Sequence, residues 1–208
     1  MKLQLFALSA AVLLAGAVAS VVLLRDGEPA SSGTQGFRGI EEPPGLTMPD
    51  FALRDQRARL VRTPDLRGKV VVLTFLETKC QAACPIVAGE IARTWKLLTP
   101  SERAQSAAVA ITADPRDDTP ANVRTFLGRH RASGAIRYLV GPAPVMRDVW
   151  RRFLVLSAVA SGDADTHSAP VRIYGRDLTW LATQHVGVEL SARNLAHDIR
   201  LALNRRPS

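Results

Sequence analysis

The fold is decided by the stretch Val70-Val-Val-Leu-Thr-Phe-Leu76, which is followed at once by Glu77-Thr-Lys-Cys80-Gln-Ala-Ala-Cys84-Pro85. The first part is a continuous apolar, β-branched run, typical of a strand buried on both faces. After Pro85 the apolar residues follow a helical spacing, so the two cysteines stand where a buried strand turns into a helix. They are the only cysteines in the chain. Two thiols this close can form a disulfide, bind a soft metal ion, or do both in turn.

Strand and helix patterns alternate on both sides of this stretch. The strands are expected at residues 51–53, 60–61, 70–76, 107–112, 136–140, 171–174 and 179–185. The helices are expected at 85–98, 120–131, 144–154 and 192–204. The first helix should bury the stripe Ile86, Val87, Ile91, Trp95 and Leu98. This order predicts an α/β protein with a thioredoxin-like fold, a mixed sheet flanked by helices, with an extra N-terminal β-hairpin and one inserted helix.

The amino terminus predicts export from the cytoplasm. Residues 3–24 carry no charge, and a helix of about 20 apolar residues spans a bilayer. A cleaved signal sequence is the alternative, because Ala17-Val-Ala19 resembles a peptidase site. Cleavage there would leave an apolar start to the mature chain, so an uncleaved anchor is favoured. We therefore expect an N-terminal membrane anchor or signal sequence at 1–25, a flexible tether at 26–49 rich in Gly, Ser and Pro, and a soluble domain at 50–208.

Composition narrows the function classes. The chain is 47% hydrophobic and 22% charged, which is typical of a globular protein. Its net charge of +8 comes mainly from arginine, and these arginines are scattered rather than interleaved with aromatic residues. We therefore predict no nucleic-acid binding. In an exported protein, two cysteines oxidise unless they are kept reduced or bound to a metal.

The cysteine spacing keeps both thiol and metal chemistry open. Pro85 suits the first helical position, which would make Cys84 the N-cap. The helix dipole and the neighbouring Lys79 would then favour thiolate over thiol. Dithiol oxidoreductases of this fold carry two residues between the cysteines, whereas this chain has three. Two thiolates are an incomplete site for most metals, so a third ligand should come from elsewhere.

Four histidines are candidates for that third ligand. His130 and His197 lie in or at the ends of helical segments and read most simply as surface residues, while His185 closes a strand. His167 differs, because it stands in a polar loop just before the strand expected at 171–174. In a thioredoxin-like sheet, the loop entering that strand lies against the cysteine loop. His167 is therefore the candidate ligand.

These residues together resemble the SCO/SenC family of copper chaperones. The resemblance rests on Cys80-x-x-x-Cys84-Pro85, on a His-Ser pair 83 residues after Cys84, and on Ala113-Asp-Pro-Arg-Asp-Asp-Thr-Pro120. Phe51-x-Leu53-x-Asp55 and Leu66-Arg-Gly-Lys-Val70 add to it. The match covers roughly residues 37–203, and an amino-terminal membrane anchor is usual in this family.

The resemblance implies a copper-binding metallochaperone whose metal ligands are Cys80, Cys84 and His167. Its cofactor would be a copper ion, Cu(I) or Cu(II), which two thiolates and one imidazole suit. Its partner would be the copper-centre subunit of cytochrome c oxidase or another copper client, served by copper delivery, by reduction of client cysteines, or both. The soluble domain would lie outside the cytoplasm, on the periplasmic side of a bacterial membrane. We expect Asp114 and Asp117 to shape a turn rather than to bind metal.

This chain also departs from the family pattern. Glu77 stands where an aromatic residue is usual, Ala82-Ala83 replaces the commoner Asp-Val, and Thr166 separates Asp165 from His167. Pro170 stands where thioredoxins place a cis-proline, and a cis bond here would favour thiol chemistry. The alternative function is therefore a membrane-tethered thiol–disulfide oxidoreductase without a metal role, in which Cys80 attacks and Cys84 resolves.

Overall fold

The computed structural model of the chain describes residues 36–155 and 169–205. The predicted anchor at residues 1–25 and the candidate ligand His167 lie outside these ranges. Within them, no helix is both long and apolar enough to cross a membrane. The compact unit that contains the cysteines begins at Phe37.

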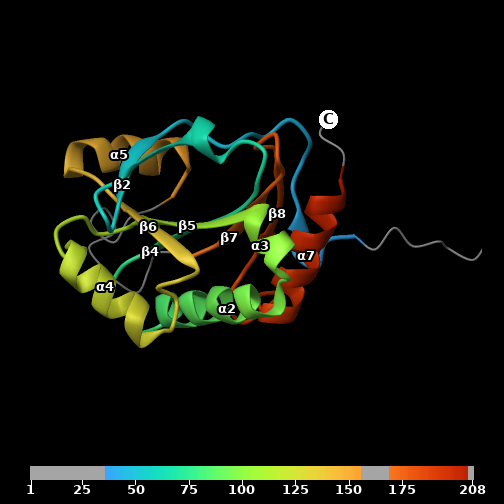
Figure 1. Cartoon of the computed structure of the whole chain (residues 1–208). Coiled ribbons are helices and arrows are strands. Elements are labelled where there is room, and N and C mark those ends of the chain that lie inside the picture. Colours follow the sequence, from blue (N-terminus) through green and yellow to red (C-terminus); the bar gives the residue numbers. More distant parts are fainter. Residues whose placement is uncertain (1–35, 156–168, 206–208) are drawn as a thin grey trace, which may run out of the picture. The chain divides into compact units, whose positions relative to one another are not determined.

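One sheet organises the described residues, with eight strands in the order β1-β8-β7-β4-β5-β6-β2-β3 (Figure 1). The strands are β1 Ile40–Glu41, β2 Ala52–Asp55, β3 Leu60–Arg62, β4 Val70–Leu76, β5 Ser106–Thr112, β6 Ile136–Val140, β7 Val171–Tyr174 and β8 Trp180–Gln184. The helices are η1 Thr63–Leu66, α2 Ala83–Leu97, α3 Pro100–Ala104, α4 Pro120–Arg129, α5 Ala143–Arg152 and α7 Ala192–Asn204.

The centre of the sheet is parallel and its outer strands are antiparallel. β4, β5 and β6 run side by side in the same direction, whereas β7 and β2 pair with β4 and β6 in the opposite direction. All seven residues of β4 are buried, as its apolar run predicted. Leu76 pairs with Thr112, so β4 and β5 end at the same edge of the sheet. The loops that follow these two strands therefore meet at this edge.

Two apolar cores cover the two faces of the sheet, which confirms the predicted mixed sheet flanked by helices. Figure 1 shows α2 and α4 on one side of the sheet and α5 on the other. Val70 and Val72 of β4 pack in the first core, with residues of α2, α4 and α7. Val71 and Phe75 pack in the second core, with residues of α5 and the β2–β3 hairpin. The alternation along β4 is what strand geometry requires.

The buried face of α2 includes several small residues that are not part of the apolar stripe predicted from the sequence. Ile86 was expected in the core, but it is 47% exposed. The helix instead buries Cys84, Val87, Ala88, Ile91 and Ala92. Alanines at the contact let the helix approach the sheet closely, and periodicity of large residues alone does not reveal them. Both cysteines belong to this core.

The domain begins earlier than the predicted boundary at residue 50. Residues 37–49, which we predicted as part of a tether, include strand β1 and the buried Met48. The backbone N–H groups of Arg38 and Gly39 donate to the carboxylate of Asp198 in α7, at 2.7 and 3.0 Å. A Cβ at position 39 would lie 2.6 Å from the carbonyl oxygen of Thr183, so this close approach requires glycine.

Both edges of the sheet carry short strands within the described residues. β1, at one edge, has two residues, and it pairs with Ala182 and Thr183 of β8. β3, at the other edge, has three residues, of which Leu60 and Arg62 are exposed. The hairpin turn before β3 is held by Asp55, which accepts hydrogen bonds from the backbone N–H groups of Arg57 and Arg59.

Candidate metal centre

The two cysteines lie at the edge of the sheet where β4 ends. A loop from Glu77 to Ala82 leads from β4 into α2, which begins at Ala83. Cys84 therefore lies inside the first turn of α2, and Ala82 is the N-cap. The prediction that Cys84 caps the helix was wrong by two residues. The N–H groups of the first helical turn have no acceptor within the helix, so proline is tolerated at any position of that turn. Pro85 therefore indicated the first turn of the helix but not the residue at which the helix begins.

Both thiols are buried and they lie against each other. Cys80 is 5% exposed and Cys84 is fully buried, and neither forms a disulfide. The backbone N–H of Cys84 donates to Sγ of Cys80 at 3.4 Å. Sγ of Cys80 is thus held beside an N–H group of the first helical turn, where the helix dipole favours negative charge. Two soft sulfur donors are brought together in a site from which water is largely excluded.

The expected thiolate character is not found at Cys84. A hydrogen bond with Cys80 and burial together raise the pKa of the Cys84 thiol far above its ordinary value, and a hydrogen bond from the backbone of Glu77 only partly offsets them. Lys79, which we expected to favour the thiolate, points to Asp117 instead, with Nζ 2.7 Å from Oδ2. A metal ion bound here would have to displace the Cys84 proton.

A buried carboxylate holds the start of the cysteine loop. Oδ1 of Asp118 accepts a hydrogen bond from the backbone N–H of Thr78 at 2.8 Å. Asp118 is 2% exposed, and its Oδ2 contacts the hydroxyl groups of Thr112 and Tyr138. From the sequence we predicted roles for Asp114 and Asp117 but not for Asp118. Three nearby carboxylates in one turn carry no periodicity that would reveal which of them faces inward.

Asp114 shapes a turn, as we predicted, whereas the side chain of Asp117 joins two loops. Oδ1 of Asp114 accepts the backbone N–H of Arg116 at 3.0 Å, which closes a turn. Asp117 forms the exposed ion pair with Lys79 across the two loops. Thr119 then caps α4 by accepting the N–H of Asn122, also as predicted. The Asp114–Pro120 segment thus supports the cysteine loop from the side.

The described histidines lie in other surroundings. His130 follows the last turn of α4 and its ring lies 4.7 Å from that of Phe126. Nδ1 of His185 lies 3.4 Å from Oε2 of Glu189, and Nδ1 of His197 lies 2.9 Å from Oδ1 of Asp198. Among residues 36–155 and 169–205, no group of three or more His, Cys, Asp or Glu side chains could hold a metal ion. The proposed third ligand, His167, lies outside these residues.

The peptide bond before Pro170 is trans. None of the peptide bonds in the described part of the chain is cis, so the cis-proline that would have linked this chain to the thioredoxin redox branch is not found. Ala169 is buried at the edge of the core that holds the cysteines, and β7 begins at Val171. β7 runs antiparallel to β4 with Arg172 opposite Leu73, so Ala169 and Pro170 lie towards the end of β4 from which the cysteine loop starts.

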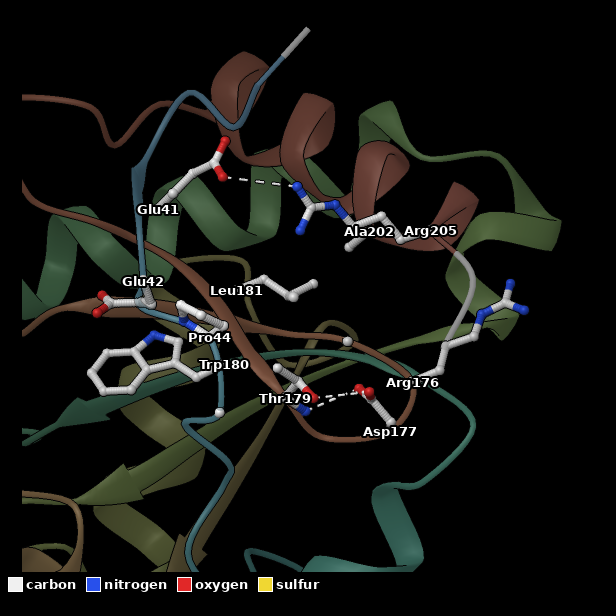
Figure 2. Close-up of a pocket in the computed structure, with 12 residues that line it drawn as sticks. Glu41, Glu42, Pro44, Arg176, Asp177, Thr179, Trp180, Leu181, Ala202 and Arg205 are labelled. Carbon is white, nitrogen blue, oxygen red and sulfur yellow. Dashed lines mark hydrogen bonds and ion pairs between the residues drawn. The ribbon is translucent and has the colours of Figure 1, made fainter. Parts of the chain in front are cut away.

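A separate pocket of about 420 Å³ lies at the opposite end of the sheet. Trp180 and Leu181 of β8 are among the residues that line it, and Glu41 and Arg205 form an ion pair there, with 3.8 Å between their charged groups (Figure 2). Trp180 pairs with Tyr174, whose neighbour Val71 lies at the start of β4. None of the predicted site residues lines this pocket.

Comparison with known proteins identifies the family. The SCO1/SenC family profile matches residues 41–204. A SCO2-like protein of Rickettsia conorii is 29% identical over 116 residues, which are 56% of this chain and 55% of that protein. The chain spans about half the length of the curated relatives that it matches.

Solved structures share the fold. Bradyrhizobium japonicum ScoI with copper bound is 23% identical with a TM-score of 0.65, over 76% of this chain and 99% of that one. BsSco, in which a disulfide switch was identified and which is described as a member of the Sco family of cytochrome c oxidase assembly proteins, is 21% identical with a TM-score of 0.64, over 81% and 99%. The fold, the paired cysteines and the family profile agree: this chain belongs to the SCO1/SenC family.

Proposed function

We propose that this protein is a copper-binding metallochaperone for the copper centre of cytochrome c oxidase. The observation that carries the proposal is the pair of buried thiols at the start of α2, where the N–H of Cys84 lies 3.4 Å from Sγ of Cys80. Soft thiolates select Cu(I) over the harder divalent ions. Burial of both sulfurs also protects a bound ion from solvent. A solved relative, ScoI of Bradyrhizobium japonicum, holds copper.

Cys80, Cys84 and His167 would hold the ion. The chain enters β7 from the end of β4 at which the cysteine loop starts, and His167 stands four residues before β7. An imidazole added to two thiolates completes a low-coordinate site for Cu(I), and it also supplies a donor that Cu(II) accepts. The client would be the copper-centre subunit of the oxidase, because BsSco is described as belonging to a family of oxidase assembly proteins.

An anaerobic copper titration tests the ligand set. The reduced full chain should retain about one copper ion per molecule, as expected for a single low-coordinate site. His167→Ala should retain clearly less after gel filtration, because two thiolates alone leave the site incomplete. His185→Ala, which removes an imidazole from the surface beside Glu189, is the control and should bind like the wild type. A His167→Ala protein that binds like the wild type would refute the role of His167.

Thiol–disulfide exchange is the second candidate, favoured by the contact between the two cysteines. In this reaction the Cys80 thiolate attacks a client disulfide, forms a mixed disulfide and releases one client thiolate. Cys84 then attacks Cys80, which releases the second client thiol and leaves a Cys80–Cys84 disulfide. The reduced full chain should then convert one equivalent of a disulfide substrate, and Cys84→Ser should stop at the mixed disulfide. A reduced protein that leaves the substrate disulfide intact would exclude this function.

The amino-terminal segment would place the domain on a membrane. We propose that residues 1–25 anchor the chain through residues 3–24, that the following residues to 36 form the tether, and that the soluble domain lies outside the cytoplasm. The absence of charge from 3 to 24 supports this, since about 20 apolar residues span a bilayer. The full chain should remain in the membrane fraction after alkaline extraction, whereas a chain beginning at residue 26 should be released. Release of both would contradict the anchor.

A further inference from the structure

A buried cluster of oxygen atoms lies beneath the cysteine loop. It is formed by the carboxylate of Asp118, the hydroxyl groups of Thr112 and Tyr138, and the carbonyl group of Leu76. These groups come from the last residues of β4 and β5, from the middle of β6 and from the loop after β5, so the cluster joins the three parallel strands. Asp118 is 2% exposed, and Thr112 and Tyr138 are fully buried. The cluster therefore has to satisfy its own hydrogen bonds.

Hydrogen atoms can be counted in this cluster. Oδ2 of Asp118 lies 2.5 Å from the Thr112 hydroxyl and 2.7 Å from the Tyr138 hydroxyl, and the Tyr138 hydroxyl lies 2.7 Å from the Leu76 carbonyl oxygen. Each of these oxygen–oxygen distances requires a hydrogen atom between the two oxygens. Thr112 and Tyr138 bring one hydroxyl hydrogen each, so two hydrogens are available for three contacts.

The missing hydrogen fits only one of the groups. The Leu76 carbonyl can only accept, and it also accepts the N–H of Ala113 at 2.8 Å. If Tyr138 donates to Leu76 and Thr112 donates to Asp118, the third hydrogen sits on Oδ2 of Asp118 and points to the Tyr138 oxygen. Every oxygen then has a partner of the right kind. Oδ1 stays free to accept the Thr78 N–H.

We propose that Asp118 is a neutral carboxylic acid that positions the cysteine loop, and through it the metal ligand Cys80. The role in metal binding rests on the proposed copper function, whereas the protonation of Asp118 does not. Burial raises the pKa of Asp118 in spite of the hydrogen bonds that it receives. Burial and the contact with Asp118 also raise the pKa of Tyr138, and Cys84 and the buried Glu77 add to this shift. A neutral Asp118 avoids a buried negative charge that has no cation beside it in the cluster.

Infrared spectroscopy tests the protonation directly. The full chain at neutral pH should show the C=O stretching band of a protonated carboxylic acid, shifted in heavy water, and the band should disappear from Asp118→Asn. Asp148→Asn, which changes a carboxylate on the surface of α5 that pairs with Arg152, should keep the band. A wild-type spectrum without this band, or a band of the same intensity in Asp118→Asn, would overturn the protonation.

Copper binding tests the positioning. Asn at 118 cannot accept from the Thr112 hydroxyl, but it keeps an acceptor for Thr78 and a donor for Tyr138. Asp118→Asn should therefore stay close to the wild-type copper affinity and the wild-type thiolate–copper absorption band. Asp118→Ala removes both and should bind copper about tenfold more weakly, with a shifted band, as found for lost outer-shell partners. If Asp118→Ala does not fold, Tyr138→Phe removes the acceptor of the Asp118 hydrogen and should shift the band in the same direction.

The protonation of Asp118, its positioning role and the copper function can each be refuted by a different result. A wild-type protein that binds no copper refutes the copper function and leaves the infrared result to decide the protonation. A folded Asp118→Ala protein, or in its place a folded Tyr138→Phe protein, with unchanged copper affinity and an unchanged absorption band overturns the positioning role. Loss of copper binding in Asp118→Asn equal to that in Asp118→Ala overturns the requirement for a neutral group.

Discussion

Replacing Cys84 by serine is expected to abolish copper retention while the domain stays folded. Cys84 is fully buried in the first turn of α2, and a hydroxyl group of similar shape can occupy its place. Serine oxygen is a hard donor that Cu(I) binds poorly, so the site loses one of its two soft ligands. The loss should exceed the roughly 10- to 100-fold cost of removing an outer-shell partner. Anaerobic titration with Cu(I), followed by metal analysis after gel filtration, measures it.

A matched control separates ligand loss from core damage. Ala88→Ser places a hydroxyl group in the same core, one turn further along α2, where the side chain is also fully buried. Burying an additional hydroxyl costs about 1–3 kcal/mol of unfolding free energy. This variant should therefore be destabilised but should bind copper like the wild type. Equal copper binding by Cys84→Ser and Ala88→Ser would show that Cys84 is not a ligand.

Removing the carboxylate of Asp198 is expected to give a large loss of stability. Asp198 is fully buried in α7, and it accepts hydrogen bonds from the N–H groups of Arg38 and Gly39 and from the side-chain amide of Gln184. Asp198→Ala leaves these buried donors without their acceptor. We expect the free energy of unfolding to fall by about 3–5 kcal/mol, which corresponds to a drop in Tm of about 10 °C.

Chemical denaturation and limited proteolysis together check this prediction. Trypsin should cleave at Arg38 faster in Asp198→Ala, because the segment before β1 loses its attachment to α7. Asp148→Ala, which removes an exposed carboxylate from another helix, should change the unfolding free energy by no more than about 0.5 kcal/mol. A loss in Asp198→Ala as small as that of Asp148→Ala would mean that the N-terminal segment is held by other contacts.

The strands and helices of the central domain could be predicted because their signals are local. The apolar run of β4, the Thr119-Pro120 start of α4 and the Ser191 cap of α7 each lie within a few residues of the element that they define. β1 could not be found in this way. It has only two residues. Its position depends on the hydrogen bond from Gly39 to Asp198 and on the close approach of Gly39 to Thr183, and both partners are far from β1 in the sequence.

The sequence predicted the place of the candidate site and its cysteine ligands, but only some of the contacts around them. The chemistry of cysteine is specific enough that the pair at the end of a strand marked the site. The direction of the Cys84 pKa shift was wrong, because it depends on burial and on the contact with Cys80. The roles of Lys79 and Asp118 depend on the loop after β5, which meets the cysteine loop only in the folded chain. The position of His167 as a ligand stays a prediction.

The short strands at the two edges of the sheet bear on how copies of the protein behave in a crowded compartment. An open sheet edge presents unpaired N–H and C=O groups, and a strand from another chain can add to it. Here one edge is a strand of two residues and the other is a strand of three residues that carries an exposed arginine. Strand addition, and the aggregation that grows from it, therefore finds little backbone to start from. Contacts with other proteins then depend on side chains rather than on backbone pairing at these edges.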